Sequence, residues 1–135
     1  MTTQNPFLDP RRAESEEHAF RAERAWADGR RDEALQGFEL AAQLEEAVAR
    51  TVPPTSTRVR SLLAISAVSL WYKANQLDRA KRLAHVFLAD GGLTEQGQRD
   101  LERLVDACCR EMELAGLALD PGIIPVEVKP SKRSK

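Results

Sequence analysis

The sequence predicts an all-α fold of two antiparallel helical hairpins followed by a C-terminal capping helix, five helices in a short α-solenoid. Apolar residues recur with helical spacing through most of residues 10–116, and Gly, Pro or Asn interrupts that spacing at intervals. No part of the chain is rich in strand-forming residues. With 42% hydrophobic and 30% charged residues among 135, the chain is too apolar to be disordered and suits a single domain.

The first expected hairpin begins at Asp9 and Pro10. Asp is a favoured N-cap, and Pro at the next position lacks the amide hydrogen that would otherwise stay unpaired. Gly29 ends this helix because glycine readily adopts the left-handed conformation that follows a helix C-terminus. The second helix is expected to start near Asp32. So short a connection predicts that the two helices pack antiparallel.

The second expected hairpin follows a break at Pro53 and Pro54, which cannot continue a helix. Ser56 or Thr57 is expected to cap the third helix, which extends to about Ala74. This helix is the most apolar segment of the chain. A helix that is apolar on more than one side is usually buried by neighbours on both flanks, so we expect it to lie in the centre.

Asn75 is expected to form the turn of the second hairpin, because Asn tolerates the left-handed conformation better than other non-glycine residues. The fourth helix is then expected over about residues 77–89. Thr94 is a favourable N-cap for the fifth helix, over about 95–115, which has a regular apolar stripe along one side. That helix is expected to close the stack.

The flanks differ from the helical domain at 10–116. Residues 1–9 are expected to be a flexible N-terminus and 117–135 an extended tail that ends in a basic, disordered segment. Residues 1–128 hold 16 basic and 21 acidic side chains, whereas 129–135 hold four basic and no acidic ones. The basic side chains of this tail are Lys129, Lys132, Arg133 and Lys135.

The two hairpins repeat a common pattern, with their turns 46 residues apart. Each consists of a helix, a tight turn and a second helix with a small residue five positions after the turn. A small side chain there lets the second helix approach the first closely. Aligning the turns pairs Gly29 with Asn75, Ala34 with Ala80 and Trp26 with Tyr72.

At these residues the chain resembles the tetratricopeptide-repeat (TPR) family over roughly residues 10–90. The first unit matches the family's turn glycine and the small, aromatic and small positions of its second helix with Gly29, Ala34, Phe38 and Ala41. In the second unit Leu77 and Ala80 fit, and Ala84 and Phe87 exchange the aromatic and small positions. The repeat of 46 residues exceeds the family's 34, and the first helices lack its tryptophan-leucine-glycine pattern. The resemblance implies an open stack with a concave side.

Three aromatic residues are candidates for contact with a partner in that groove: Trp26, Trp71 and Tyr72. Trp71 and Tyr72 are adjacent and about 100° apart on one helix, so both cannot point into the same core contact. Either one of the three is exposed in the groove, or they belong to the core. The ligand would be a partner's helix or extended peptide, or this chain's own segment 117–128. The open stack also suggests a homo-oligomer.

Catalytic and metal-binding patterns are lacking, so we expect no enzyme, cofactor or metal site. His85 is expected to be a partly buried structural histidine and His18 a solvated one. Cys108 belongs to the apolar stripe, whereas Cys109 flanks it and has no His nearby in the sequence. Two adjacent cysteines on a helix do not form a disulfide with each other readily, which suits the cytoplasm.

The sequence therefore predicts a non-catalytic protein–protein interaction module, an adaptor or scaffold subunit. No segment is apolar enough to span a membrane, and the N-terminus does not resemble a signal peptide. The alternative is a nucleic-acid-associated or regulatory protein that uses its basic tail, together with exposed arginines such as Arg30, Arg31, Arg58 and Arg60. Elsewhere the acidic surface would repel phosphates.

Overall fold

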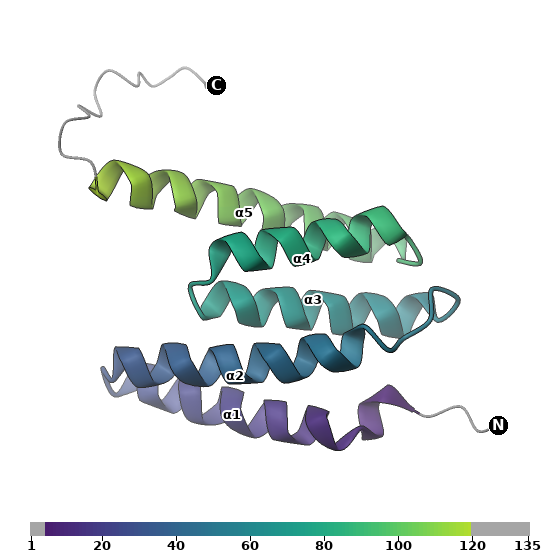
Figure 1. The fold of residues 1–135 in the computed structure, drawn as a ribbon, viewed down its shortest axis with the longest axis horizontal. Coiled ribbons are helices and arrows are strands. Elements are labelled where there is room, and N and C mark those ends of the chain that lie inside the picture. The colour runs from purple at the N-terminus through teal and green to yellow at the C-terminus, as the bar shows by residue number, and fades with distance from the viewer. Residues whose placement is uncertain (1–4, 120–135) are drawn as a thin grey trace.

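The computed structural model describes residues 5–119, which confirm the all-α prediction. They form a 3₁₀ turn and five α-helices, and no strand occurs within this range. Figure 1 shows these elements: η1 (Pro6–Leu8), α1 (Pro10–Ala27), α2 (Arg31–Ala49), α3 (Thr57–Lys73), α4 (Leu77–Asp90) and α5 (Glu95–Leu119).

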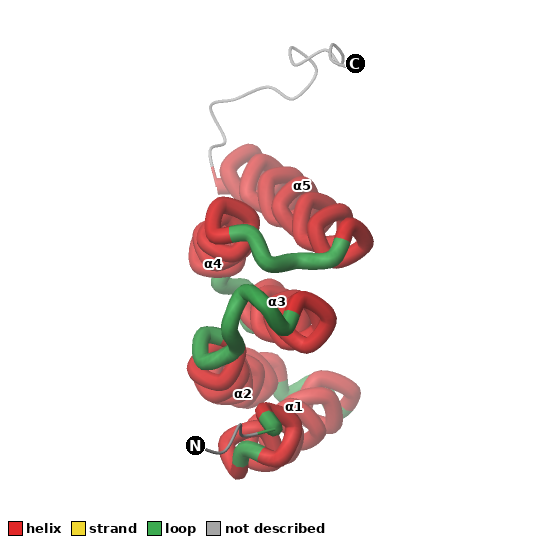
Figure 2. Tube along the Cα trace, turned by 90° about the vertical axis from the view of Figure 1, so that its right-hand side faces the viewer, coloured by secondary structure: helices red, strands yellow, loops and turns green. Residues whose placement is uncertain are grey.

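The helices stack in chain order as two antiparallel hairpins, α1–α2 and α3–α4, with α5 against the second. Seen from the side, α1, α3 and α5 form one layer and α2 and α4 the other (Figure 2). Helix α3 packs against α2, α4 and α5, so its predicted central position is confirmed. Because the hairpins are antiparallel, α1, α3 and α5 all run in the same direction and end on the same side of the molecule (Figure 1).

The two hairpin turns have the same backbone conformation. Gly29 has a φ of 81° and Asn75 a φ of 61°, so both adopt the predicted left-handed conformation. The same two hydrogen bonds close each turn, from the first and second residues after the helix cap back to its last turn. They are Gly29 N to Trp26 O (3.1 Å), Arg30 N to Ala25 O (2.8 Å), Asn75 N to Tyr72 O (2.9 Å) and Gln76 N to Trp71 O (3.0 Å).

Small residues bring the helices of each hairpin together. Ala34 and Ala80, the equivalent positions after each turn, are fully buried. The core around them is also rich in alanine, and large side chains fill it at a few positions, chiefly Phe38, Trp71 and Phe87. Close-packed alanines leave little volume for aromatic rings, which accounts for the low aromatic content of the sequence.

Buried polar groups connect the loops at the other end of the stack. The Arg60 guanidinium donates hydrogen bonds to the carbonyl oxygens of Val52 (2.9 Å) and Gly91 (3.2 Å), and it lies 5.0 Å from the centre of the Phe87 ring. A buried guanidinium needs such partners to offset its lost hydration. Arg60 therefore joins the loop before α3 to the loop after α4.

A close contact seats α5 on α3. The Ser61 hydroxyl accepts a hydrogen bond from the Thr94 amide (2.9 Å), and Thr94 Oγ1 accepts one from the Gly97 amide (2.9 Å). The predicted N-cap role of Thr94 is thus confirmed. A Cβ atom on Gly97 would lie 2.6 Å from Ser61 Oγ, so a larger residue would not fit without movement. Between Glu95 and Arg110, the exposed residues of α5 are all charged or polar, as expected for a helix that caps a solenoid.

The N-terminal flank differs from the expectation. Pro6–Leu8, inside the segment expected to be flexible, form a 3₁₀ turn. Asp9 caps α1 as predicted, accepting a hydrogen bond from the Arg11 amide (2.9 Å). The hydrogen bonds from the Arg11 side chain and amide lower the pKa of Asp9 to about 2.

The C-terminal flank also differs, because α5 continues to Leu119 and not to about residue 115. Gly116 lies inside the helix, where glycine costs only about 1 kcal/mol relative to alanine and does not by itself end a helix. The remainder of the expected tail, with its basic side chains, lies outside the described residues.

Candidate functional site: a groove between the hairpins

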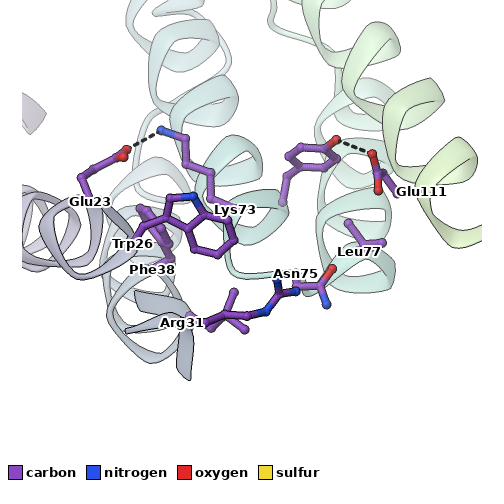
Figure 3. A pocket seen from close by; sticks show the side chains of 10 residues that line it. Glu23, Trp26, Arg31, Phe38, Lys73, Asn75, Leu77 and Glu111 are labelled. Carbon is purple, nitrogen blue, oxygen red and sulfur yellow. Dashed lines mark hydrogen bonds and ion pairs between the residues drawn. The ribbon is translucent and has the colours of Figure 1, made fainter. Parts of the chain in front are cut away.

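A groove of about 400 Å³ opens at the end of the stack where both hairpin turns lie. All five helices contribute to it (Figure 3). Its apolar or aromatic lining residues are Trp26, Leu35, Phe38, Tyr72 and Leu77, its charged ones are Glu23, Arg31, Lys73 and Glu111, and Asn75 completes the set. The parallel course of α1, α3 and α5 is what brings residues so distant in sequence to one end.

Two of the three predicted aromatic residues line this groove. Trp26 is 49% exposed, and the Arg31 guanidinium lies 5.3 Å from the centre of its ring. Tyr72, its equivalent in the second hairpin, is half-buried, and its hydroxyl donates a weak hydrogen bond to Glu111 Oε2 at 3.4 Å. Because the two turns are alike, the residues that precede them by three positions face the same groove.

Charged side chains border the apolar floor. Lys73 Nζ lies 3.0 Å from Glu23 Oε2, so an exposed ion pair links α1 to α3, and the same ammonium lies 5.7 Å from the centre of the Phe38 ring. Burial and the nearby Glu111 carboxylate raise the pKa of Tyr72. The phenol therefore keeps its proton at neutral pH and remains a hydrogen-bond donor. The groove presents an apolar surface between charges of both signs.

Trp71, the third candidate, does not line this groove. It belongs to the core, the alternative that the sequence left open. It is 1% exposed, its indole nitrogen donates a hydrogen bond to Glu46 Oε1 (2.8 Å), and the Arg79 guanidinium lies 4.3 Å from its ring centre. The step of about 100° between neighbouring helical residues turns Trp71 towards α2 and α4 while Tyr72 faces the groove.

The histidines and cysteines do not form a reactive cluster. His85 is exposed, which corrects the expectation of partial burial: the buried stripe of α4 passes through Ala84 and Phe87 on either side of it. His18 is half-buried, with Nε2 3.8 Å from Glu14. Burial raises the pKa of the Cys108 thiol, so the reactive thiolate is disfavoured. Within residues 5–119, no three His, Cys, Asp or Glu side chains are arranged to hold a metal ion.

The arginines that favoured the nucleic-acid alternative are partly neutralised. Arg60 is buried rather than exposed as expected, because it bonds the two loops. Arg30 forms ion pairs with Asp28 (3.0 Å) and Glu33 (2.6 Å), and Arg31 stacks on Trp26. Among the residues named for this role, Arg58 is exposed.

Another hollow, of about 260 Å³, lies between α2 and α4, and its charged lining comprises Glu46, Arg50, Arg79 and Arg82. Arg50 pairs with Glu46 (2.9 Å), and Arg82 pairs with Asp78 (2.9 Å). With Asp78 counted, three arginines stand against two carboxylates at this hollow, which is a weak net charge for binding a polyanion.

Sequence reasoning missed the groove residues other than Trp26 and Tyr72, including the aromatic Phe38. Leu35, Lys73 and Glu111 have no distinguishing motif, and each becomes a lining residue only because separate helices end side by side. Leu35 had one available signal, its position next to the buried Ala34 at the start of α2.

Comparisons with known proteins add no relationship to this geometry. No family model matches the chain, and no curated protein and no solved structure is significantly similar to it. In the described part of the chain, no helix combines the length and the apolar character that a membrane span requires.

Proposed function

We propose that this protein is a non-catalytic protein-interaction module that binds an apolar segment of a partner protein in the groove between its hairpins. The observation that carries the proposal is Trp26, a tryptophan half exposed beside an apolar floor in a groove of about 400 Å³. Tryptophan, tyrosine and arginine are the residues most enriched at the energetic centres of protein interfaces. All three line this groove.

The repeat architecture supports the same proposal. The two hairpins have the same turn and the same buried alanine after it, as expected for units of a solenoid, and a helix that exposes charged and polar residues between Glu95 and Arg110 closes the stack. We propose that these hairpins are degenerate TPR-like repeats. Solenoids of this kind bind partners along surfaces formed where successive repeats meet, and this groove lies between the two hairpins.

The lining residues define the ligand by its chemistry. The floor accepts a few aliphatic or aromatic side chains, and the volume lies within the range of sites that bury a small ligand or a short peptide segment. The groove is bordered by two cations, Arg31 and Lys73, and by two carboxylates, Glu23 and Glu111. These charges favour a segment whose apolar residues are flanked by charged ones. An apolar peptide or one face of a partner helix meets these requirements.

Trp26→Ala tests the proposal, with Phe20→Ala as a matched control. Both are exposed aromatics of α1 stacked by an arginine, but Phe20 does not line the groove. A photo-crosslinking residue in place of Lys73, which lines the groove, would identify a partner in extracts of the host, with the same residue at position 20 as the control. The identified partner's affinity is expected to fall about tenfold or more in Trp26→Ala and to stay unchanged in Phe20→Ala. Equal losses in both variants would refute the groove as the binding site.

The nucleic-acid alternative depends mainly on the basic tail. It predicts binding that weakens steeply with salt and disappears when Lys129, Lys132, Arg133 and Lys135 are replaced by alanine. The pairing of Arg30 and the burial of Arg60 reduce the support that the helical domain gives it. The interaction module is therefore the function that we propose.

A further inference from the structure

We infer that the groove is a docking site for the chain's own segment 123–128, Ile-Ile-Pro-Val-Glu-Val, so that a partner must compete with it. The inference rests on the proposed function, because it concerns the same groove. It specifies an occupant and a means of regulating access.

The course of the helices places the segment within reach. Helices α1, α3 and α5 end on the same side of the molecule (Figure 1), and the groove lies at that end. Glu111 of α5 lines the groove, and the helix continues from there to Leu119, about 12 Å further at 1.5 Å per residue. The helix therefore ends about 12 Å beyond Glu111, and the chain must turn back to reach the groove. Residues 120–128 can span up to about 30 Å, which exceeds this return distance, and Pro121-Gly122 is a pair that favours reversal of the chain.

The chemistry of the segment matches the floor of the groove. In an extended conformation, alternate side chains point the same way, so Ile124, Val126 and Val128 would share one side. Three aliphatic side chains in a row suit the apolar lining of the groove, which extends from Tyr72 and Leu77 of the second hairpin to Trp26, Leu35 and Phe38 of the first. Pro125 restricts the backbone to extended conformations and lowers the entropy lost on docking.

Charge and tethering favour docking within one chain. Residues 5–119 carry three more acidic than basic side chains, and residues 120–135 carry two more basic than acidic ones. The two parts therefore attract each other. A short tether also holds the segment at an effective concentration on the order of 1 mM, so a weak contact suffices to fill the groove. A partner's apparent association constant is then reduced in proportion to the fraction of molecules in which the segment occupies the groove.

The experiment uses the full chain and the quenching of tryptophan fluorescence by acrylamide. Trp26 is 49% exposed in the groove and Trp71 is 1% exposed in the core, so the quencher reports on Trp26 and Trp71 is an internal buried reference. The test variant is Ile124→Asp/Val126→Asp. Its control is Ser131→Asp/Ser134→Asp, which adds the same charges outside the segment.

If the segment docks, the quenching constant rises about two-fold or more in the test variant and stays unchanged in the control. A synthetic peptide of residues 121–129 should then restore protection to the test variant. Equal quenching of the natural chain and the test variant overturns the inference. Protection that disappears on dilution also overturns it, because the segment would then come from a second copy.

The inference and the proposed function fail separately. Partner binding that depends on Trp26, together with equal quenching in both chains, removes only the self-docking segment. If the segment docks but no partner binds, even to the test variant whose groove is free, only the proposed function is refuted.

Discussion

The two hairpins have the same turns but different interiors. Gly29 and Asn75 close them with the same hydrogen bonds. With the turns aligned, however, the large and small core residues exchange places: Ala25, Phe38 and Ala41 of the first hairpin correspond to Trp71, Ala84 and Phe87 of the second, and all six are buried. The same backbone device therefore accommodates different packing, because a core requires total volume to be filled and not a fixed residue at each position.

The comparison also separates residues by their role. Trp26 and Tyr72 are equivalent and line one groove, whereas the neighbours that precede them, Ala25 and Trp71, are both in the core. Ser15 and Ser61 are likewise equivalent and buried, but Ser15 donates a hydrogen bond to Ala41 within its own hairpin, and Ser61 accepts one from Thr94 at the start of α5. The second hairpin thus bonds to a further helix.

The largest expected effect is on Trp71, the buried member of the tryptophan pair. Trp71→Ala is expected to lower the free energy of unfolding by about 3–5 kcal/mol, because it leaves a cavity and removes the bond to Glu46. Trp26→Ala, at an exposed position, should cost less than about 1 kcal/mol. Urea denaturation followed by circular dichroism measures both. A smaller loss for Trp71→Ala than for Trp26→Ala would contradict the assignment of Trp71 to the core and of Trp26 to the surface.

The next effect concerns the contact between the second hairpin and α5. Gly97→Ala would place a methyl group 2.6 Å from Ser61 Oγ and is expected to lower the free energy of unfolding by about 1–3 kcal/mol. Gly116→Ala, in the same helix, meets nothing within 4 Å and should be neutral or stabilising by up to about 1 kcal/mol, since alanine favours helix. Thermal denaturation distinguishes them, and equal effects of the two substitutions would argue against the close seating of α5.

The smallest effects test the equivalence of the two turns. Gly29→Ala is expected to cost about 1 kcal/mol, because its left-handed backbone disfavours a Cβ atom although nothing lies within 4 Å of it. Asn75→Gly should raise the free energy of unfolding by up to about 0.5 kcal/mol, because glycine adopts this left-handed conformation without strain. Both are measured by urea denaturation. If Gly29→Ala stabilised the protein, or if Asn75→Gly destabilised it, the two turns would not be energetically alike.

Local chemistry made much of the fold predictable. Proline at 53 and 54, the left-handed residues at 29 and 75 and the caps at 9 and 94 act over a few residues, so the sequence alone located the helix boundaries around them. The end of α5 was missed because Gly116 was read as a stop, although an isolated glycine does not end a helix. Arg60 was taken as exposed because its partners, the carbonyl oxygens of Val52 and Gly91, belong to loops distant in sequence.

The sequence by itself determined the helices, their hairpin pairing and the turn conformations, since these depend on periodicity, capping and short connections. Only the tertiary structure decided which aromatic residue is buried and which is available to a partner. Trp26, Trp71 and Tyr72 are all large aromatic residues near the C-terminal end of their helices. Their exposure depends on which neighbouring helix lies over each of them, and that is set by the packing of all five helices together.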